Sequence, residues 1–192
     1  MGNDRRFWWM SCLGAGALAG VALPPLGWPW LLWACLVPLW SLAAQRRAPL
    51  TAAGLWGLAA VLVSHRWLLW LHPLDWVGVP GPLSLPLCVL LWLLCAVVGG
   101  LLVLAWLVLV RRLDASRLGT ALIGALVWGL AEVALARGPL FWLGLGASAL
   151  PGDPALAGVG ALAGTGAIAA LQVLIGWSLW QALTTSTGRR RW

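Results

Sequence analysis

Long stretches without a charged residue dominate the pattern of apolar and polar positions along this chain. They cover residues 7–45, 48–65, 76–110, 118–131 and 154–188. A helix that crosses a bilayer needs about 20 apolar residues. The first stretch can hold two short helices, since Pro24, Pro25 and Gly27 near its middle remove backbone donors and permit a turn.

We therefore predict an all-α, polytopic helical membrane protein with a single transmembrane domain over residues 1–192. About six transmembrane helices are expected, and we place them roughly at 7–24, 28–44, 50–71, 84–110, 118–136 and 158–183. Composition supports this fold class, because 62% of the residues are hydrophobic and only 9% are charged. A soluble domain of this length could not bury so much apolar surface, so its solvent must largely be lipid.

The basic residues predict an orientation. All twelve are arginine, and the chain has no lysine. If the helices alternate across the bilayer, every arginine except Arg66 and Arg137 falls on one side. Arginine-rich connections stay in the cytoplasm, so we expect a cytoplasmic N-terminus. The net charge of +7 does not indicate nucleic-acid binding, because these charges are too sparse to form one basic face.

The cysteines and histidines predict neither a metal site nor a bound cofactor. The four cysteines lie in apolar stretches without a close partner, and we interpret them as small buried hydrophobic residues: Cys12, Cys35, Cys88 and Cys95. Cys12 does not fit a lipoprotein signal, since the apolar stretch before it is too short, and the N-terminus is expected to stay as an anchor. His65 and His72 lack the further ligands that a zinc site needs.

Glycines and tryptophans predict how the helices pack and where they end. Gly16 with Gly20, and Gly160 with Gly164, have the four-residue spacing that lets two helices approach closely. Most of the seventeen tryptophans are expected to be anchors in the headgroup zone. Those near predicted helix ends are Trp28, Trp30, Trp67, Trp70, Trp76 and Trp142, whereas Trp106 and Trp128 lie deeper.

Charged residues inside or beside apolar helices are costly and therefore carry functional hypotheses. Arg66 either extends to the lipid phosphates at the membrane surface or contacts a phosphate or carboxylate in a lipid-binding groove. Glu132 either accepts hydrogen bonds from a neighbouring helix or loop backbone or belongs to a substrate site. Glu132 and Arg137 are five positions apart, about 500° around a helix, so they would not share a face of an unbroken helix.

Several kinds of chemistry leave no trace in this sequence. It has no glycine-rich phosphate loop with lysine, no zinc motif of histidine and glutamate, and no Gly-x-Ser-x-Gly turn. No segment between the predicted helices exceeds about 20 residues. A soluble catalytic domain is therefore not expected within these residues.

Two long motifs resemble the membrane domain of bacterial apolipoprotein N-acyltransferases. The first is SHRWLLWLHPLDWVGVPGPLSLPLCVLLWLL, and the second is VWGLAEVALARGPLFWLGLGAS. The start, ALPPLGWPWLLWACLVPLWSL, is similar to the family's opening hairpin, so the resemblance runs from about residue 13 to residue 183. The departures are the wide spacing of Glu132 and Arg137, Phe141 in place of a common proline, and Ala147 in place of a usual tyrosine.

The resemblance implies transfer of an acyl chain from a phospholipid to the N-terminal cysteine of a lipidated apolipoprotein, in the bacterial inner membrane. In that family a Glu, Lys and Cys triad lies in a nitrilase-like domain outside the membrane. This chain has no lysine and its cysteines lie in predicted spans, so no catalytic residue is carried over. The positions that the resemblance suggests for the lipid-substrate site are Arg66, Trp67, Trp76, Glu132, Arg137 and Trp142.

Two functional hypotheses stay open from the sequence. In the first, the chain is a truncated or split member that binds lipid substrates, either acting with a separate nitrilase-like chain or left inactive. In the second, it is a non-catalytic lipid-binding or transport protein on the same scaffold.

Overall fold

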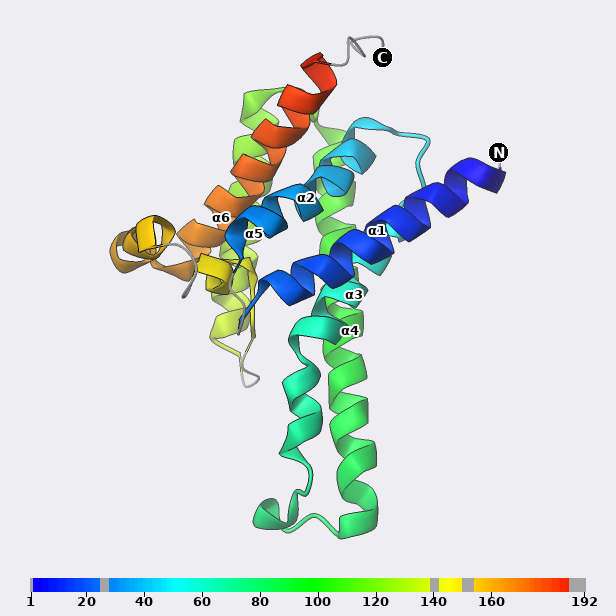
Figure 1. Ribbon diagram of the computed structural model, residues 1–192, viewed down its shortest axis with the longest axis vertical. Helices are drawn as coiled ribbons and strands as arrows, with labels where there is room; N and C mark the ends of the chain where they lie inside the picture. Colours follow the sequence, from blue (N-terminus) through cyan, green and yellow to red (C-terminus); the bar gives the residue numbers. More distant parts are fainter. Residues whose placement is uncertain (1, 25–27, 139–141, 150–153, 187–192) are drawn as a thin grey trace.

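The computed structural model describes residues 2–24, 28–138, 142–149 and 154–186, which form helices joined by short loops (Figure 1). The α-helices are α1 (Gly2–Ala22), α2 (Pro29–Ala44), α3 (Thr51–Ser64), α4 (Gly81–Arg112), α5 (Leu118–Ala136) and α6 (Pro154–Ser186). Three 3₁₀ turns are η1 (Arg66–Leu71), η2 (Asp75–Val77) and η3 (Leu145–Ala149). The all-α prediction is confirmed. The predicted turn at 25–27 and the basic residues Arg189–Arg191 lie outside the described residues.

Four described segments are long and apolar enough to cross a membrane: Thr51–Leu71, Gly81–Arg112, Leu118–Ala136 and Pro154–Ser186. The helix α2 is apolar but has only 16 residues, or about 24 Å at 1.5 Å per residue, which is shorter than a hydrocarbon core of about 30 Å. The helix α1 has 21 residues and begins with charged positions around Asp4. The fold is that of a polytopic helical membrane protein. Four of the six predicted transmembrane helices correspond to these segments, and a membrane-spanning role of α1 and α2 stays a prediction.

Hydrogen bonds between distant segments place the arginine-bearing loops together. Arg111, at the end of α4, donates from Nε to the Leu42 carbonyl (3.0 Å) and from Nη2 to the Ala48 carbonyl (2.9 Å). Trp177, in the second half of α6, donates to the Ala115 carbonyl at 2.8 Å. Figure 1 shows these ends and the start of α1 in the upper part of the molecule. We call the segments 5–6, 45–50 and 111–117 the arginine-rich end.

Two predicted helices differ from the structure. The helix predicted at 50–71 is α-helical only to Ser64 and continues as the tighter turn η1. The helix predicted at 158–183 is bent inside α6, because Gly164 has φ +77° and ψ 173°. Only glycine adopts that conformation readily. The prediction that Gly160 and Gly164 form a packing face is therefore wrong, since Gly164 marks the bend and has open space around it.

The glycine pair in α1 does form a helix contact. A Cβ atom on Gly16 would lie 2.8 Å from the backbone carbon of Trp56, and one on Gly20 would lie 2.6 Å from the Ala60 carbonyl oxygen. Real Cβ atoms do not approach that closely, so the backbones of α1 and α3 pack directly on each other. The pairing of Gly16 with Trp56 and of Gly20 with Ala60 also shows that the two helices run in the same direction.

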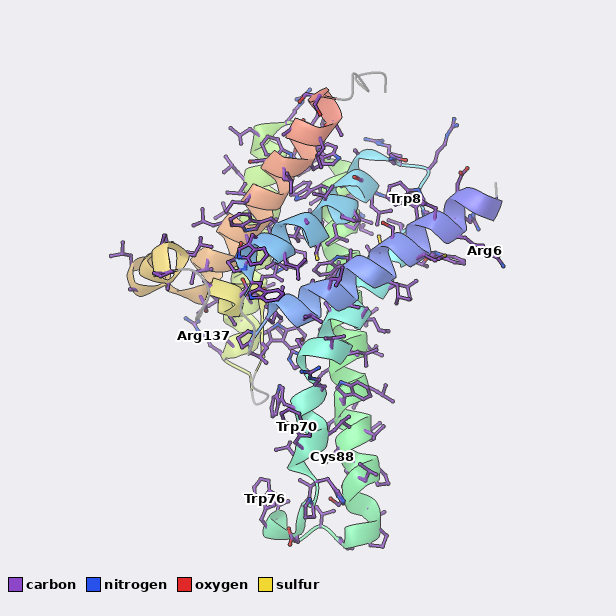
Figure 2. The ribbon with its side chains drawn as sticks, in the orientation of Figure 1. Arg6, Trp8, Trp70, Trp76, Cys88 and Arg137 are labelled. Carbon is purple, nitrogen blue, oxygen red and sulfur yellow. The ribbon has the colours of Figure 1, made fainter. Side chains whose placement is uncertain are left out.

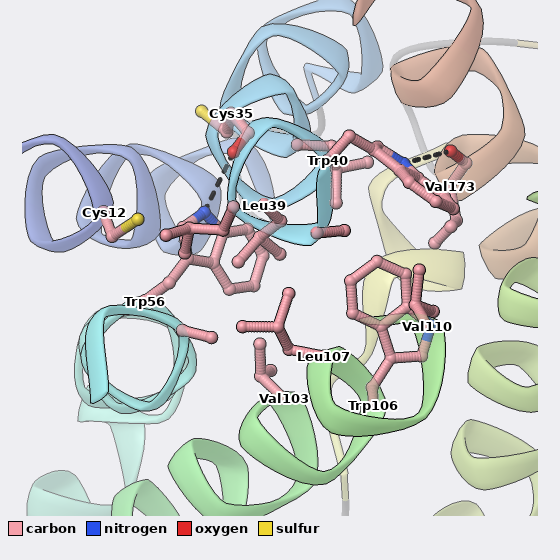
Figure 3. Packing of buried hydrophobic residues seen from close by; sticks show 14 of the residues in the cluster. Cys12, Cys35, Leu39, Trp40, Trp56, Val103, Trp106, Leu107, Val110 and Val173 are labelled. Atoms are coloured by element: carbon pink, nitrogen blue, oxygen red, sulfur yellow. Dashed lines mark hydrogen bonds between the residues drawn. The ribbon is translucent and has the colours of Figure 1, made fainter. Parts of the chain in front are cut away.

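Buried tryptophans connect the other helices (Figure 3). Trp40 of α2 donates from its indole nitrogen to the Val173 carbonyl of α6 at 3.2 Å. Trp56 of α3 donates to the Cys35 carbonyl of α2 at 2.9 Å. Each indole fills interior volume and satisfies its one donor on a neighbouring helix. The interpretation of most tryptophans as interfacial anchors did not foresee this interior role.

The α1–α3 contact predicts a difference between two glycines of one helix. Gly16→Ala should lower the free energy of unfolding by about 2 kcal/mol, because the added methyl group meets the Trp56 backbone, which cannot move aside. Gly14→Ala is the matched control, since Gly14 has open space around its Cβ position. Thermal or SDS-induced unfolding in detergent micelles measures both. Equal stabilities of the two variants would contradict the direct backbone contact.

Candidate functional site

An apolar cavity of about 300 Å³ lies between α3, α4, α5 and residues 142–145. Its inner wall includes three indole rings that meet edge to face: Trp106 and Trp128 with centroids 5.3 Å apart, and Trp56 and Trp128 with centroids 6.1 Å apart. Leu102 and Ala105 of α4 also line the cavity, and both are exposed on the surface of the chain. The cavity is therefore open toward the lipid-facing surface beside α4.

Glu132 is the acidic residue in this cavity wall, and its carboxylate accepts three hydrogen bonds. The donors are the Trp128 indole nitrogen at 3.0 Å, the Leu145 backbone nitrogen at 2.6 Å and the Gly146 backbone nitrogen at 3.1 Å. Trp128 precedes Glu132 by one turn of α5, while Leu145 and Gly146 begin η3. A buried carboxylate is costly without such partners. The predicted bonding of Glu132 to loop backbone is thus confirmed.

A glycine makes room for this carboxylate. A Cβ atom on Gly144 would lie 2.8 Å from Oε1 of Glu132. No larger residue fits at position 144 unless the carboxylate moves. The local sequence Leu143–Gly144–Leu145–Gly146 therefore lets the chain pass close to α5 and present two amides to one side chain.

His65 holds the same segment from the other side. It is buried, and its Nε2 atom accepts a hydrogen bond from the Leu143 backbone nitrogen at 3.3 Å. Its Nδ1 atom lies 2.8 Å from the Ser64 hydroxyl oxygen, and its ring centroid is 5.0 Å from that of Trp142. Sequence reasoning considered His65 only as a metal ligand and missed this role. The sequence feature that could have indicated this role was a histidine beside a serine at the end of an apolar helix.

A second set of buried polar groups fixes η3 from α6 and α2. The Ser148 hydroxyl donates to the Leu145 carbonyl at 2.7 Å and accepts from the Gln172 amide nitrogen at 2.7 Å. The Gln172 side-chain oxygen in turn accepts from the Trp33 indole nitrogen. Sequence reasoning did not single out Gln172. Its signal was its position as a lone amide within a long apolar stretch.

The structure brings together only part of the predicted substrate-binding set. Glu132 and Trp142 line the cavity, and Trp67 packs with Trp142 against the buried cluster that contains Val61 and Leu68. Glu132 and Trp142 thus belong to the cavity wall, whereas Trp67 is not among the residues that line the cavity.

The other three predicted residues lie outside the cavity. Arg66 is the exposed first residue of η1, and Arg137 is exposed directly after α5. Trp76 is 69% exposed on η2, at the far end of the projection formed by residues 66–96 (Figure 2). Glu132 does not pair with Arg137, because within the described ranges the only ion pair joins Arg117 and Asp114. A contact of these exposed residues with lipid stays a prediction.

Comparison with known families decides what kind of domain carries this cavity. The model of the apolipoprotein N-acyltransferase N-terminal domain matches residues 15–178. The chain belongs to this family. The matched range contains every element around the cavity of this N-terminal domain, and each of the six predicted site residues.

Curated relatives agree with the family match. An apolipoprotein N-acyltransferase of Parasynechococcus marenigrum (strain WH8102) is 48% identical over 194 residues, covering 99% of this chain and 40% of the relative. One from Prochlorococcus marinus (strain MIT 9313) is 47% identical over 190 residues, covering 94% of this chain and 37% of the relative. One from Gloeobacter violaceus (strain ATCC 29082 / PCC 7421) is 33% identical over 153 residues, covering 75% and 28%. The chain thus spans about 40% or less of the length of these relatives.

The bonds to Glu132 predict how the cavity wall responds to substitution. Glu132→Gln keeps one acceptor but turns an NH₂ group toward backbone N–H donors. We expect a loss of about 2 kcal/mol in the free energy of unfolding and faster exchange of the Leu145 and Gly146 amide hydrogens. Hydrogen exchange followed by mass spectrometry measures the second effect. Asp114→Asn, at an exposed acid, is the control, and unchanged exchange at 145–146 in the Glu132 variant would contradict the role assigned to Glu132.

Proposed function

We propose that this chain forms the lipid-binding membrane part of an apolipoprotein N-acyltransferase. The observation that carries the proposal is an apolar, tryptophan-walled cavity that is open toward lipid, inside a domain of that family. A cavity with apolar walls and few polar groups suits a hydrocarbon chain. The proposed occupant is one acyl chain of a phospholipid, which serves as the acyl donor.

The residues of the cavity favour binding and positioning of the acyl donor, not catalysis of the acyl transfer. Its carboxylate, Glu132, already accepts three hydrogen bonds and is not poised as a general base. None of the four cysteines lines the cavity, and the chain contains no lysine. The thiol, amine and carboxylate that the family resemblance implies would therefore come from residues outside this sequence, on the same polypeptide or on a separate nitrilase-like chain. The contribution of this part is to hold the donor in a fixed orientation.

Arg66 and Arg137 are proposed to contact lipid phosphates at the mouth of the site. Both are exposed: Arg66 begins η1 directly after α3, and Arg137 follows the last residue of α5, on the side opposite the arginine-rich end. A long guanidinium side chain can lie along apolar surface while its charge reaches the headgroup zone. Trp76, farther along the same side, is proposed to stand in that zone beside the lipidated N-terminal cysteine of the acceptor lipoprotein.

A chimera tests the proposed function directly. This chain would replace the matching part of the Parasynechococcus marenigrum relative, and the purified chimera would receive phospholipid and a diacylated lipopeptide. We expect a triacylated product by mass spectrometry, and at least about a tenfold lower kcat/KM for Ala131→Trp, because the indole fills the cavity that binds the donor chain.

Leu130→Trp is the matched control, since Leu130 is 68% exposed on the neighbouring lipid-facing position of α5. Thermal unfolding shows whether each variant is folded. If a folded chimera binds phospholipid but forms no product while the unaltered relative does, the acyltransferase proposal is wrong and a lipid-binding or transport function takes its place.

We also propose that the arginine-rich end faces the cytoplasm and that the chain lies in the bacterial inner membrane. The proposal rests on the grouping of segments 5–6, 45–50 and 111–117 at one end of the helices. Alkaline phosphatase fused after Trp192 should be inactive, and the same enzyme inserted at the exposed Gly78 should be active. The reverse pattern of activities would overturn the orientation.

A further inference from the structure

A second apolar groove lies on the opposite face of the α3–α4 pair, separate from the cavity. Its volume is about 450 Å³, and it is lined by Trp9 of α1, by Thr51, Gly54 and Leu58 of α3, and by Gly100 and Leu104 of α4. Nothing in the proposed acyl transfer uses this groove.

Two glycines form the floor of the groove. A Cβ atom on Gly100 would lie 2.9 Å from the Gly54 carbonyl oxygen, so the two helices are in backbone contact there. Leucines on both helices form the sides. From Thr51 to Leu58 the groove follows α3 for about 10 Å at 1.5 Å per residue. That is about a third of a hydrocarbon core of 30 Å, which suits the upper part of one acyl chain.

The polar end of the groove lies at the arginine-rich end. The Trp9 indole nitrogen donates to the Thr51 hydroxyl oxygen at 3.1 Å, which joins α1 to the first residue of α3. Arg46 and Arg47 are exposed in the loop that leads into α3. Arg111 fixes that loop through its bond to the Ala48 carbonyl. The two arginines therefore lie on a loop that leads directly to Thr51 at the polar end of the groove, and the bond from Arg111 holds this loop in place.

More positive charge comes from α1. Arg5 and Arg6 precede Trp9 by four and three residues, so they share its face of the helix, and both are exposed. Acidic residues offset little of the positive charge of the arginine-rich end, because Asp114 is paired with Arg117 and only Asp4 lies on α1. A ligand with a hydrocarbon chain and a negative headgroup matches both parts of this surface.

We propose that the groove binds one anionic phospholipid from the leaflet at the arginine-rich end. One acyl chain lies between the leucines of α3 and α4, and the headgroup phosphate is bound by Arg46 and Arg47. Guanidinium groups bind phosphate through paired hydrogen bonds. A zwitterionic lipid binds less tightly, because the cation of its own headgroup offsets the phosphate charge. The lipid is distinct from the acyl donor, which occupies the other face and the other end of α3.

Native mass spectrometry of the detergent-solubilised chain tests this proposal, with dioleoylphosphatidylglycerol and dioleoylphosphatidylcholine as probes. The wild type should retain phosphatidylglycerol preferentially. Arg46→Gln with Arg47→Gln should weaken that binding by about 25-fold, since each arginine beside an anionic headgroup contributes about fivefold. Arg112→Gln with Arg117→Gln removes the same formal charge from the end of α4 and the loop after it, outside the loop that leads into α3, and should leave the binding within about twofold.

Variants that fill the groove test whether an acyl chain lies in it. Gly54→Leu should abolish the tight phosphatidylglycerol adduct, and its Cβ fits because the nearest atom, the Gly100 carbonyl oxygen, is 3.7 Å away. Gly119→Leu, which adds the same side chain to open space on α5, is the control. Thermal unfolding shows that the variants are folded, and Leu104→Trp is a second filling variant that leaves the glycine contact intact.

Three outcomes would overturn the proposal. They are equal loss of binding in the two double-arginine variants, retention of the tight adduct by folded groove-filling variants, and equal retention of the two lipids by the wild type. All are binding measurements that involve no acyl transfer. A failure here therefore leaves the proposed function standing, and an inactive chimera leaves this proposal standing.

Discussion

The hydrogen bonds to the Glu132 carboxylate are the interaction on which the candidate site depends. In a lipid environment, water cannot satisfy a backbone amide that leaves a helix, so the protein must provide each acceptor. The irregular segment 142–149 meets that requirement because Glu132 accepts from Leu145 and Gly146, while His65 accepts from Leu143. Without these acceptors, a non-helical segment could not lie against α5, and the cavity would lose one wall.

The packing of the helices combines the smallest and the largest side chains. Glycines allow α3 to contact α1 and α4 backbone to backbone, as at Gly57, whose added Cβ would lie 2.9 Å from the backbone carbonyl carbon of Gly99. Tryptophans fill the wider spaces and satisfy their donors on carbonyls of neighbouring helices, as Trp106 does on Gly124 at 2.8 Å. The cavity lies where neither glycine contacts nor tryptophan side chains fill the space between the helices. The indole rings there meet edge to face and leave a gap that no further side chain enters.

Much of the fold followed from the sequence, because charge-free stretches and prolines mark helix ends without reference to distant residues. The helix predicted at 118–136 is α5 itself, and that predicted at 28–44 differs from α2 by one residue. The bend at Gly164 could not be predicted, since neighbouring glycines such as Gly166 look identical in the sequence and only the packing selects one of them. The candidate site was harder to predict from the sequence, because it too depends on tertiary packing. Glu132 stood out as a charge in an apolar helix, but its partners lie across a loop, and His65 and Gln172 become important only through tertiary contacts.

The two lipid-facing hollows lie on opposite faces of one helix pair, and their floors share a contact. Gly57 and Gly99 line the cavity, while Gly54 and Gly100 line the groove, so the same close approach of α3 to α4 shapes both. Their polar parts differ in kind. The cavity contains a carboxylate that accepts three hydrogen bonds from the protein, and the cavity walls are largely apolar. The groove ends at Thr51, and the loop before it carries the exposed Arg46 and Arg47, which favours a negatively charged headgroup. The two proposals thus assign one lipid as a reactant and another as a structural ligand to the same helix pair, because the features that would select them lie at opposite ends of α3.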